Sequence, residues 1–130
     1  MDGVRKRLRT LLRNTGLPDA ELSVLFIGDR AMRSLNHAWR GKDRTTDVLS
    51  FSLREGTFSH IRPEMLGDIV ISVPVAARQA REEGHTLARE IDRLLVHGLV
   101  HLLGYDHERG PQEARRMSKR ERELLKGIGA

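Results

Sequence analysis

The stretch TLAREIDRLLVHGLVHLLGYDH, residues 86–107, predicts the central helix of the fold and the turn that ends it. Thr86 is suited to the N-cap of this helix, and Gly104 is suited to stop it. The apolar positions between them follow helical spacing at Leu87, Ile91, Leu94, Leu95 and Leu102. We therefore expect this helix to pack against a sheet.

The rest of the chain predicts that sheet and four more helices. Runs rich in β-branched and apolar residues predict strands at 21–28 (a buried strand), 47–53 and 67–73. Helices are predicted at 3–14, from Asp29 as N-cap to Gly41, from Pro74 to Gly84, and from Pro111 to Lys126. Residues 54–66 contain Gly and Pro and predict a loop. The expected fold is α+β, a small sheet of three to four strands packed with about five helices in a single domain, 1–130.

Composition narrows the function classes. Lys and Arg number 23 against 18 Asp and Glu, which gives a formal charge of +5. Such a domain attracts polyanions such as RNA, although many small basic proteins bind no nucleic acid. The absence of cysteine excludes disulfides, thiolate metal sites and cysteine nucleophiles. With no apolar leader at the N-terminus and no apolar run of membrane-spanning length, the sequence predicts a cytoplasmic protein with no membrane contact.

Three of the six histidines fall within HGLVHLLGYDH, residues 97–107. His97 and His101 are four residues apart, so on a helix they lie on one face, one turn apart. Gly104 allows the chain to turn, and His107 can then return as a third ligand. The interpretation is a site for one zinc ion, or a similar divalent metal, with one coordination position left open. The alternative is three unrelated surface or core histidines.

The same histidine spacing occurs in metzincin metallopeptidases. Those enzymes carry a glutamate directly after the first histidine as general base, and this chain has Gly98 there. The base must then come from elsewhere, or the metal itself must activate the water. Gly98 also has a structural explanation, which is close packing of the helix against the sheet.

HGLVHLLGYDH, together with LNHAWRGKDRTTDVLSFSL and LGDIVIS, resembles the YbeY family of bacterial rRNA-maturation factors. The resemblance covers residues from about 20 to 125. It implies a single-strand-specific, metal-dependent endoribonuclease with one zinc-type ion on His97, His101 and His107. It also implies ribosomal RNA as substrate, notably the 3′ end of the small-subunit rRNA, with a role in ribosome quality control. The small ribosomal subunit or its assembly factors would be the partners.

Arg40 of WRGKDR matches the family's active-site arginine, which implies a catalytic and substrate-binding role. Independently of the resemblance, an arginine can present two donors to one phosphate, and Lys42 and Arg44 extend the basic cluster as further substrate-binding candidates. The alternative is a solvated helix end, where basic side chains are favoured.

The sequence departs from the family pattern in three places. Thr45-Thr46 replaces Pro-Thr, and Phe51-Ser52 replaces Phe-Pro. Both changes affect backbone restriction only, so we expect function to be kept. The chain also begins almost at its first helix, so its sheet is expected to lack the short strand that precedes this helix in relatives.

The carboxylates near the histidines allow several interpretations. Asp106 can orient an imidazole, act as the missing base, or cap the turn after Gly104. Asp68 can cap or bond locally. The alternation of basic and acidic side chains along the charged last helix is typical of a solvated helix face. Its basic members are Arg115, Arg116, Lys119, Arg120 and Arg122, and its acidic members are Glu113, Glu121 and Glu123.

Two other functions remain open at this stage. One is a metallopeptidase-like metallohydrolase, which the histidine spacing favours and Gly98 opposes. The other is a ribosome-assembly binding protein whose metal is structural, which a fourth ligand from Asp106, Asp68 or His60 would favour.

Overall fold

The computed structural model describes residues 2–53 and 64–129. This part of the chain forms five α-helices, one 3₁₀ turn and three strands, which confirms the α+β prediction. In chain order the elements are α1 (Asp2–Asn14), β1 (Glu21–Ile27), α2 (Asp29–Arg40), β2 (Val48–Ser52), β3 (Met65–Ser72), α3 (Val73–Glu83), α4 (Leu87–Leu102), η1 (His107–Arg109) and α5 (Pro111–Gly127). None of the helices in these residues is long and apolar enough to cross a membrane.

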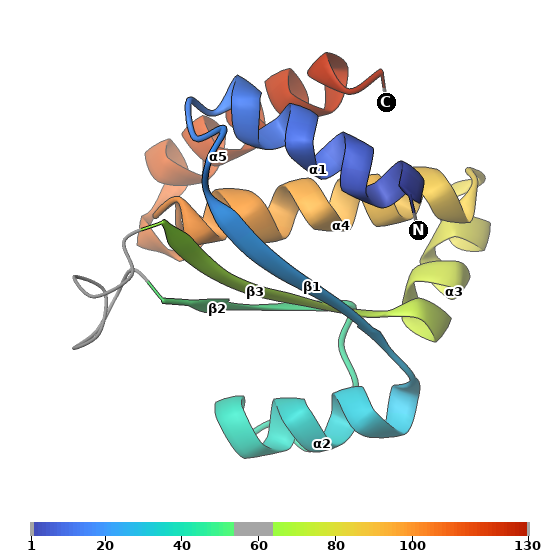
Figure 1. The fold of residues 1–130 in the computed structure, drawn as a ribbon. Coiled ribbons are helices and arrows are strands. Elements are labelled where there is room, and N and C mark those ends of the chain that lie inside the picture. The colour runs from blue at the N-terminus through green and yellow to red at the C-terminus, as the bar shows by residue number, and fades with distance from the viewer. Residues whose placement is uncertain (1, 54–63, 130) are drawn as a thin grey trace.

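The sheet is mixed, with strand order β1-β3-β2 (Figure 1). The central strand β3 is parallel to β1 and antiparallel to β2. The prediction of a buried first strand was wrong, because β1 lies at an edge and its side chains alternate between half-buried and exposed. Leu25 on β1 is 55% exposed. Strand β2 forms the opposite edge.

The predicted loop at 54–66 is too long at its C-terminal end. Residues 54–63 lie outside the described residues, but Met65 and Leu66 belong to β3. The register between β1 and β3 shifts here, since Glu21 pairs with Met65 and Leu22 with Gly67. Leu66 lies in the core at 1% exposure, and on the side of β2 its carbonyl accepts from the Leu53 amide at 3.0 Å. The glycine that reads as a strand boundary is therefore inside the strand.

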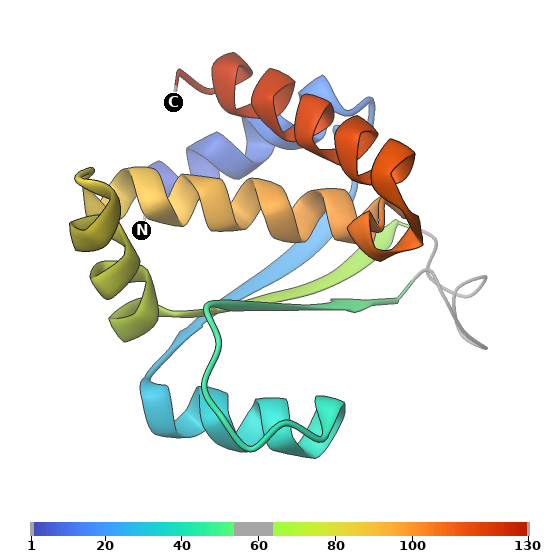
Figure 2. The ribbon, with the colours of Figure 1, turned by 180° about the vertical axis from the view of Figure 1, so that it is seen from behind.

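The main core lies between the sheet and the helices α1, α4 and α5, which cover one face (Figures 1 and 2). Ile69 and Ile71 of β3 point into this core and meet the apolar stripe of α4. That stripe includes Leu94, Leu95 and Leu99, each at most 1% exposed. Burying a leucine contributes roughly 1.5–3 kcal/mol, so this contact fixes α4 against the sheet. The predicted packing of the histidine-bearing helix on strands 47–53 and 67–73 is confirmed.

The other face of the sheet is covered by α2 (Figure 1). A smaller core of Met32, Leu49 and Val70 holds it there. Gly28, not Asp29, is the N-cap residue of α2. The Asp29 carboxylate instead accepts from Arg78 at 3.0 Å, which ties the first turn of α2 to α3. The helix ends as predicted, with Gly41 in the left-handed conformation.

Candidate functional site

Helix α4 places His97 and His101 on one face, with ring centroids 4.7 Å apart. The predicted cap is confirmed, because the Thr86 hydroxyl accepts from the Arg89 amide at 3.2 Å. The helix runs unbroken from there to Leu102. Its last two turns therefore carry the two histidines, with His101 in the final turn and His97 in the turn before it.

The turn after α4 brings the third histidine back. Gly104 has φ +101°, a conformation that side-chain-bearing residues rarely adopt. Asp106 then caps η1, since its Oδ1 accepts from the Glu108 amide at 2.9 Å. Of the three interpretations of Asp106, the capping one is observed. As the first residue of η1, His107 has its ring centroid 5.7 Å from that of His101 and 6.3 Å from that of His97.

These three rings match a divalent metal in donor type and proximity. Imidazoles that share one tetrahedral ion, with metal–nitrogen distances near 2.0–2.1 Å, have ring centroids roughly 5 Å apart. Within residues 2–53 and 64–129, however, no three histidine or carboxylate groups already form a complete metal-binding set. Burial lowers the pKa of His101, and the neighbouring His97 and His107 lower it further. The neutral imidazole, which is the form that binds metal, is therefore favoured.

A carboxylate from α5 contacts this group. His97 Nδ1 lies 3.0 Å from Glu121 Oε2, and both side chains are partly buried. A carboxylate in this position fixes the tautomer of a metal-binding histidine and leaves Nε2 free to act as the ligand. The sequence analysis missed Glu121 by assigning it to a solvated face. Its helical spacing to Met117 and Leu124, both 1% exposed, marks the inward side of α5.

Gly98 is required by packing. A Cβ at this position would lie 2.9 Å from Ile69 Cγ2 and 3.1 Å from Ser50 Oγ. The Ser50 hydroxyl also donates to the Gly98 carbonyl at 3.3 Å. The close-packing explanation is therefore confirmed, and a glutamate side chain has no room here.

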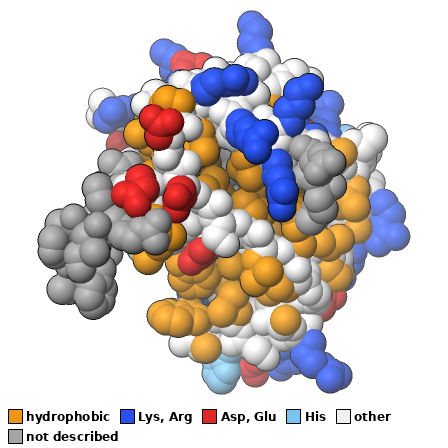
Figure 3. Space-filling model, in the orientation of Figure 1, with side chains coloured by type: hydrophobic (Ala, Val, Ile, Leu, Met, Phe, Trp, Pro, Cys, Tyr) orange, Lys and Arg blue, Asp and Glu red, His pale blue; other side chains and the backbone are white. Residues whose placement is uncertain are grey.

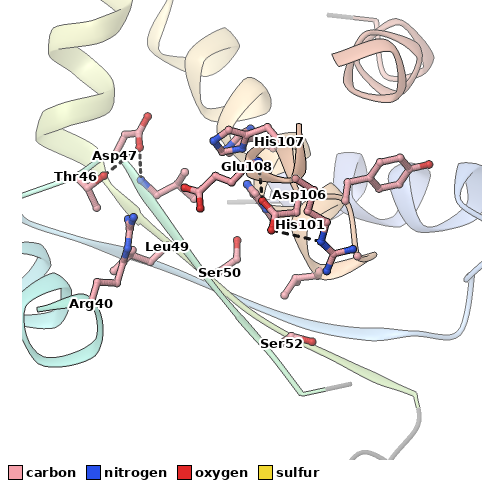
Figure 4. Close-up of a pocket in the computed structure, with 16 residues that line it drawn as sticks. Arg40, Thr46, Asp47, Leu49, Ser50, Ser52, His101, Asp106, His107 and Glu108 are labelled. Atoms are coloured by element: carbon pink, nitrogen blue, oxygen red, sulfur yellow. Dashed lines mark hydrogen bonds and ion pairs between the residues drawn. The ribbon is translucent and has the colours of Figure 1, made fainter. Parts of the chain in front are cut away.

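The three histidines line a pocket of about 480 Å³ together with Arg40, the edge of β2 and residues 104–109. In Figure 4, Arg40 enters from α2, on the side of the pocket opposite His101 and His107. The other members of the predicted basic cluster, Lys42 and Arg44, are exposed and do not line the pocket. Arg44 instead offers its carbonyl to Asn36 Nδ2 at 2.9 Å.

The edge strand β2 and the segment just before it supply further lining residues, which are Ser50 and Ser52 on the strand and Thr46 and Asp47 ahead of it. The Asp47 carboxylate is already engaged, because it accepts from the Val48 amide at 2.8 Å and from Gln79 Nε2 at 3.3 Å. Asp68 does not line the pocket, since it pairs in register with Phe51 on the sheet face that α2 covers. His60 lies outside the described residues.

A family model described as "Endoribonuclease YbeY" matches residues 2–129. Among curated relatives of that name, the one from Anaeromyxobacter sp. (strain Fw109-5) is 52% identical over 97% of this chain, and the one from Geobacter sulfurreducens is 48% identical over 94%. The chain spans 64% of the length of the first and 82% of the second.

The solved structure of a Thermotoga maritima protein has a similar fold. Its solution structure matches with a TM-score of 0.70 at 26% identity, and the match covers 98% of this chain and 79% of that one. The likeness extends over the sheet and the helices that carry the histidine pocket.

Proposed function

Because the chain belongs to the endoribonuclease YbeY family, we propose that it cleaves single-stranded RNA in its histidine pocket, with one zinc ion or a similar divalent metal. The substrate we propose is ribosomal RNA, notably the 3′ end of the small-subunit rRNA, during ribosome maturation and quality control. Its partners are then the small subunit or its assembly factors. The observation that supports the proposal is the meeting of three imidazoles and Arg40 in one pocket of about 480 Å³.

His97, His101 and His107 are the residues that would hold the metal. The bound ion would supply Lewis-acid polarisation of a phosphodiester oxygen. Glu121 acts through His97, because its Oε2 accepts from Nδ1–H at 3.0 Å and so leaves Nε2 as the ligand atom. Glu121 is thus a positioning residue.

Arg40 binds the scissile phosphate in this proposal. Its guanidinium can donate two parallel hydrogen bonds to the non-bridging oxygens and stays charged at any working pH. It lines the pocket from the side opposite the histidines, so a phosphate can lie between the two. Lys42 and Arg44 are outside the lining, and their proposed contribution is attraction of the strand from solvent.

Glu108 is the carboxylate that we propose for proton transfer. Among the described residues, three carboxylates line the pocket, and those of Asp47 and Asp106 are engaged in the hydrogen bonds described above. The Glu108 side chain has no ion-pair or hydrogen-bond partner among the described residues. It lies between His107 and the residues of β2 in Figure 4, within the cleft where the substrate would bind.

The two alternatives have less support. A metzincin-type peptidase needs its general base at position 98, where Ile69 and Ser50 leave no space for a side chain. A purely structural metal calls for a closed set of ligands. Asp106 is engaged in capping, and Asp68 is absent from the pocket lining.

The test compares Arg40→Glu with the wild type on single-stranded RNA and on casein-like peptides. Arg40→Glu should abolish RNA cleavage while metal content and folding stay intact, because Arg40 is exposed and is not a ligand. Arg40→Lys should recover only part of the activity, since a point charge lacks the guanidinium fork. A charge-matched control is Arg81→Glu, on the exposed surface of α3.

Equal RNA cleavage by the wild type and Arg40→Glu would identify a contaminating nuclease and contradict the proposal. Metal-dependent peptide cleavage by a wild type that leaves RNA intact would favour the peptidase.

A further inference from the structure

A second, smaller hollow of about 220 Å³ lies on α5, beside the histidine pocket. It is lined by Tyr105, Arg116, Lys119, Arg120 and Glu123. Tyr105 also lines the histidine pocket, so this residue borders both cavities. Figure 2 shows the start of α5 directly beside the C-terminal end of α4, which explains why the two cavities are neighbours.

The charge of this α5 hollow is mainly positive, with three cationic side chains against one carboxylate. Arg116, Lys119 and Arg120 fall at helical spacing on one face of α5 and span about 6 Å along its axis. The sequence analysis treated these residues as part of a solvated face. The structure gathers them around a concavity instead.

Two of the three cations are available to a ligand. Lys119 is exposed and has no ion pair among the described residues. Arg116 is 68% exposed, and its pair with Glu113 is long at 3.6 Å, so it is weak. Arg120 is more firmly held, because it donates to the Asn14 carbonyl at 3.3 Å and contacts Glu123 at 3.2 Å. Arg120 is therefore the least available of the three.

We propose that the α5 hollow binds the phosphate backbone of the single-stranded RNA as the strand leaves the histidine pocket past Tyr105. This inference rests on the proposed function of that pocket. A chain of phosphates fits the observations, because the cations recur along one helix face in a hollow that shares Tyr105 with the histidine pocket. Lys and Arg side chains also gather on the neighbouring surface over α1 in Figure 3, which raises the local attraction for a polyanion.

The experiment measures binding rather than cleavage. The probe is a 2′-O-methyl oligouridylate of about ten nucleotides, within the usual site size of a small domain. The double variant Arg116→Gln/Lys119→Gln is compared with the wild type over a range of salt concentrations. The matched control is Arg81→Gln/Arg89→Gln, which removes two exposed cations from α3 and the first turn of α4, at the far end of α4 from the histidines.

Each phosphate contact on a single strand adds about 0.7 to the slope of log affinity against log salt. Because two contacts are removed, the slope of the double variant should be shallower than that of the wild type by about 1.4, while the control keeps the wild-type slope. An unchanged slope in the double variant would overturn the proposal. The proposal would also be overturned if the double variant lost affinity for polyaspartate but bound RNA as the wild type does, because the hollow would then bind an acidic protein segment.

Cleavage of unmodified RNA, measured in parallel, separates the two proposals. If the wild type cuts RNA and the double variant keeps the wild-type salt slope, RNA binding in the α5 hollow is contradicted and the nuclease proposal stands. If the slope falls as expected but the wild type does not cut RNA in the presence of divalent metal, RNA binding in the α5 hollow is supported and the nuclease proposal fails.

Discussion

Helix α4 has a histidine–glutamate pair near each end, and the two pairs differ in burial and in the groups that contact them. Near the N-terminal end, His85 Nε2 donates to Glu90 Oε1 at 2.7 Å, and Glu90 is 0% exposed. Arg93 also donates to Glu90, at 3.1 Å from Nε, so the carboxylate is matched by a permanent cation. Near the C-terminal end, His97 meets Glu121, whose carboxylate makes no hydrogen bond or ion pair with an arginine among the described residues and interacts with Arg93 only as a more distant charge. The His97 ring faces two further histidines and a pocket.

The difference shows that the residue pair does not determine the role. Glu90 is enclosed by its partners and holds α4 to the α3–α4 turn, which is a structural task. Glu121 leaves one imidazole nitrogen of His97 directed away from it, in a cavity that can admit a ligand. Changes at the two pairs should therefore separate stability from metal binding.

The largest effect is expected when a histidine of the pocket is removed. His101→Ala should weaken metal binding by more than about 100-fold, because two imidazoles rarely hold a first-row ion tightly. His85→Ala, at the other pair, is the matched control and should keep the metal. The measurement is metal content after gel filtration, with affinity from competition against a chelating dye. Full metal occupancy in His101→Ala would remove that residue from the ligand set.

A loss of stability is expected at the buried pair. Glu90→Gln leaves Arg93 and His85 without their carboxylate, so the free energy of unfolding should fall by about 2–3 kcal/mol. Metal affinity should stay at the wild-type value. Urea denaturation gives the first quantity and chelator competition the second. Unchanged stability would show that the Glu90 cluster contributes no net energy to the fold.

The converse result is expected at Glu121. Glu121→Gln should lower metal affinity by about 10- to 100-fold while stability changes by no more than about 0.5 kcal/mol. Because Gln can still accept from Nδ1–H, its effect isolates the carboxylate charge, and Glu121→Ala should weaken binding further. Cobalt substitution adds a spectroscopic readout, since the visible bands of the bound ion report the orientation of His97. Identical affinity and spectra in all three proteins would make Glu121 an ordinary surface residue.

The smallest effect is a pH dependence of stability. Burial would raise the pKa of Glu90, but hydrogen bonds from Arg93 and His85 outweigh it and leave that pKa below its ordinary value. The stabilising contribution is therefore complete above the unfolded-state pKa of about 4.3 and is lost as the pH falls through the lower folded-state pKa. Urea midpoints measured below about pH 5 should decline more steeply for the wild type than for Glu90→Gln. Parallel declines would contradict this assignment.

Much of the fold was predictable because its signals are local. Thr86, Gly41 and Gly84 mark helix ends through capping and backbone conformation, and each does so in the structure. The loop predicted at 54–66 is too long because Gly67 resembles a strand boundary in the sequence, whereas its place inside β3 depends on pairing with β1. The exposure of β1 likewise depends on strand order, which no local pattern specifies.

In the pocket, too, local features were predictable from the sequence and long-range contacts were not. The histidines share eleven residues of sequence, so their spacing alone predicted that they would meet. Glu121 follows His97 by 24 residues and Arg40 precedes it by 57. Only the packing of α5 brings Glu121 to His97, and only the packing of α2 brings Arg40 to the pocket. The resemblance to a family supplied Arg40, and only the structure supplied Glu121. Lys42 and Arg44 adjoin Arg40 in sequence, but the left-handed turn at Gly41 directs the chain away from the pocket.

The most direct test of the central claim is the rate of single-stranded RNA cleavage as zinc is added back to chelator-treated protein. We expect no cleavage without metal, a rate that rises in proportion to the added ion, and a plateau at one equivalent per chain. His101→Ala should show no such rise at the same concentrations, while His85→Ala should follow the wild type. Full cleavage by the metal-free protein, or an equal response from His101→Ala, would contradict the claim that this pocket cuts RNA with a metal held by its histidines.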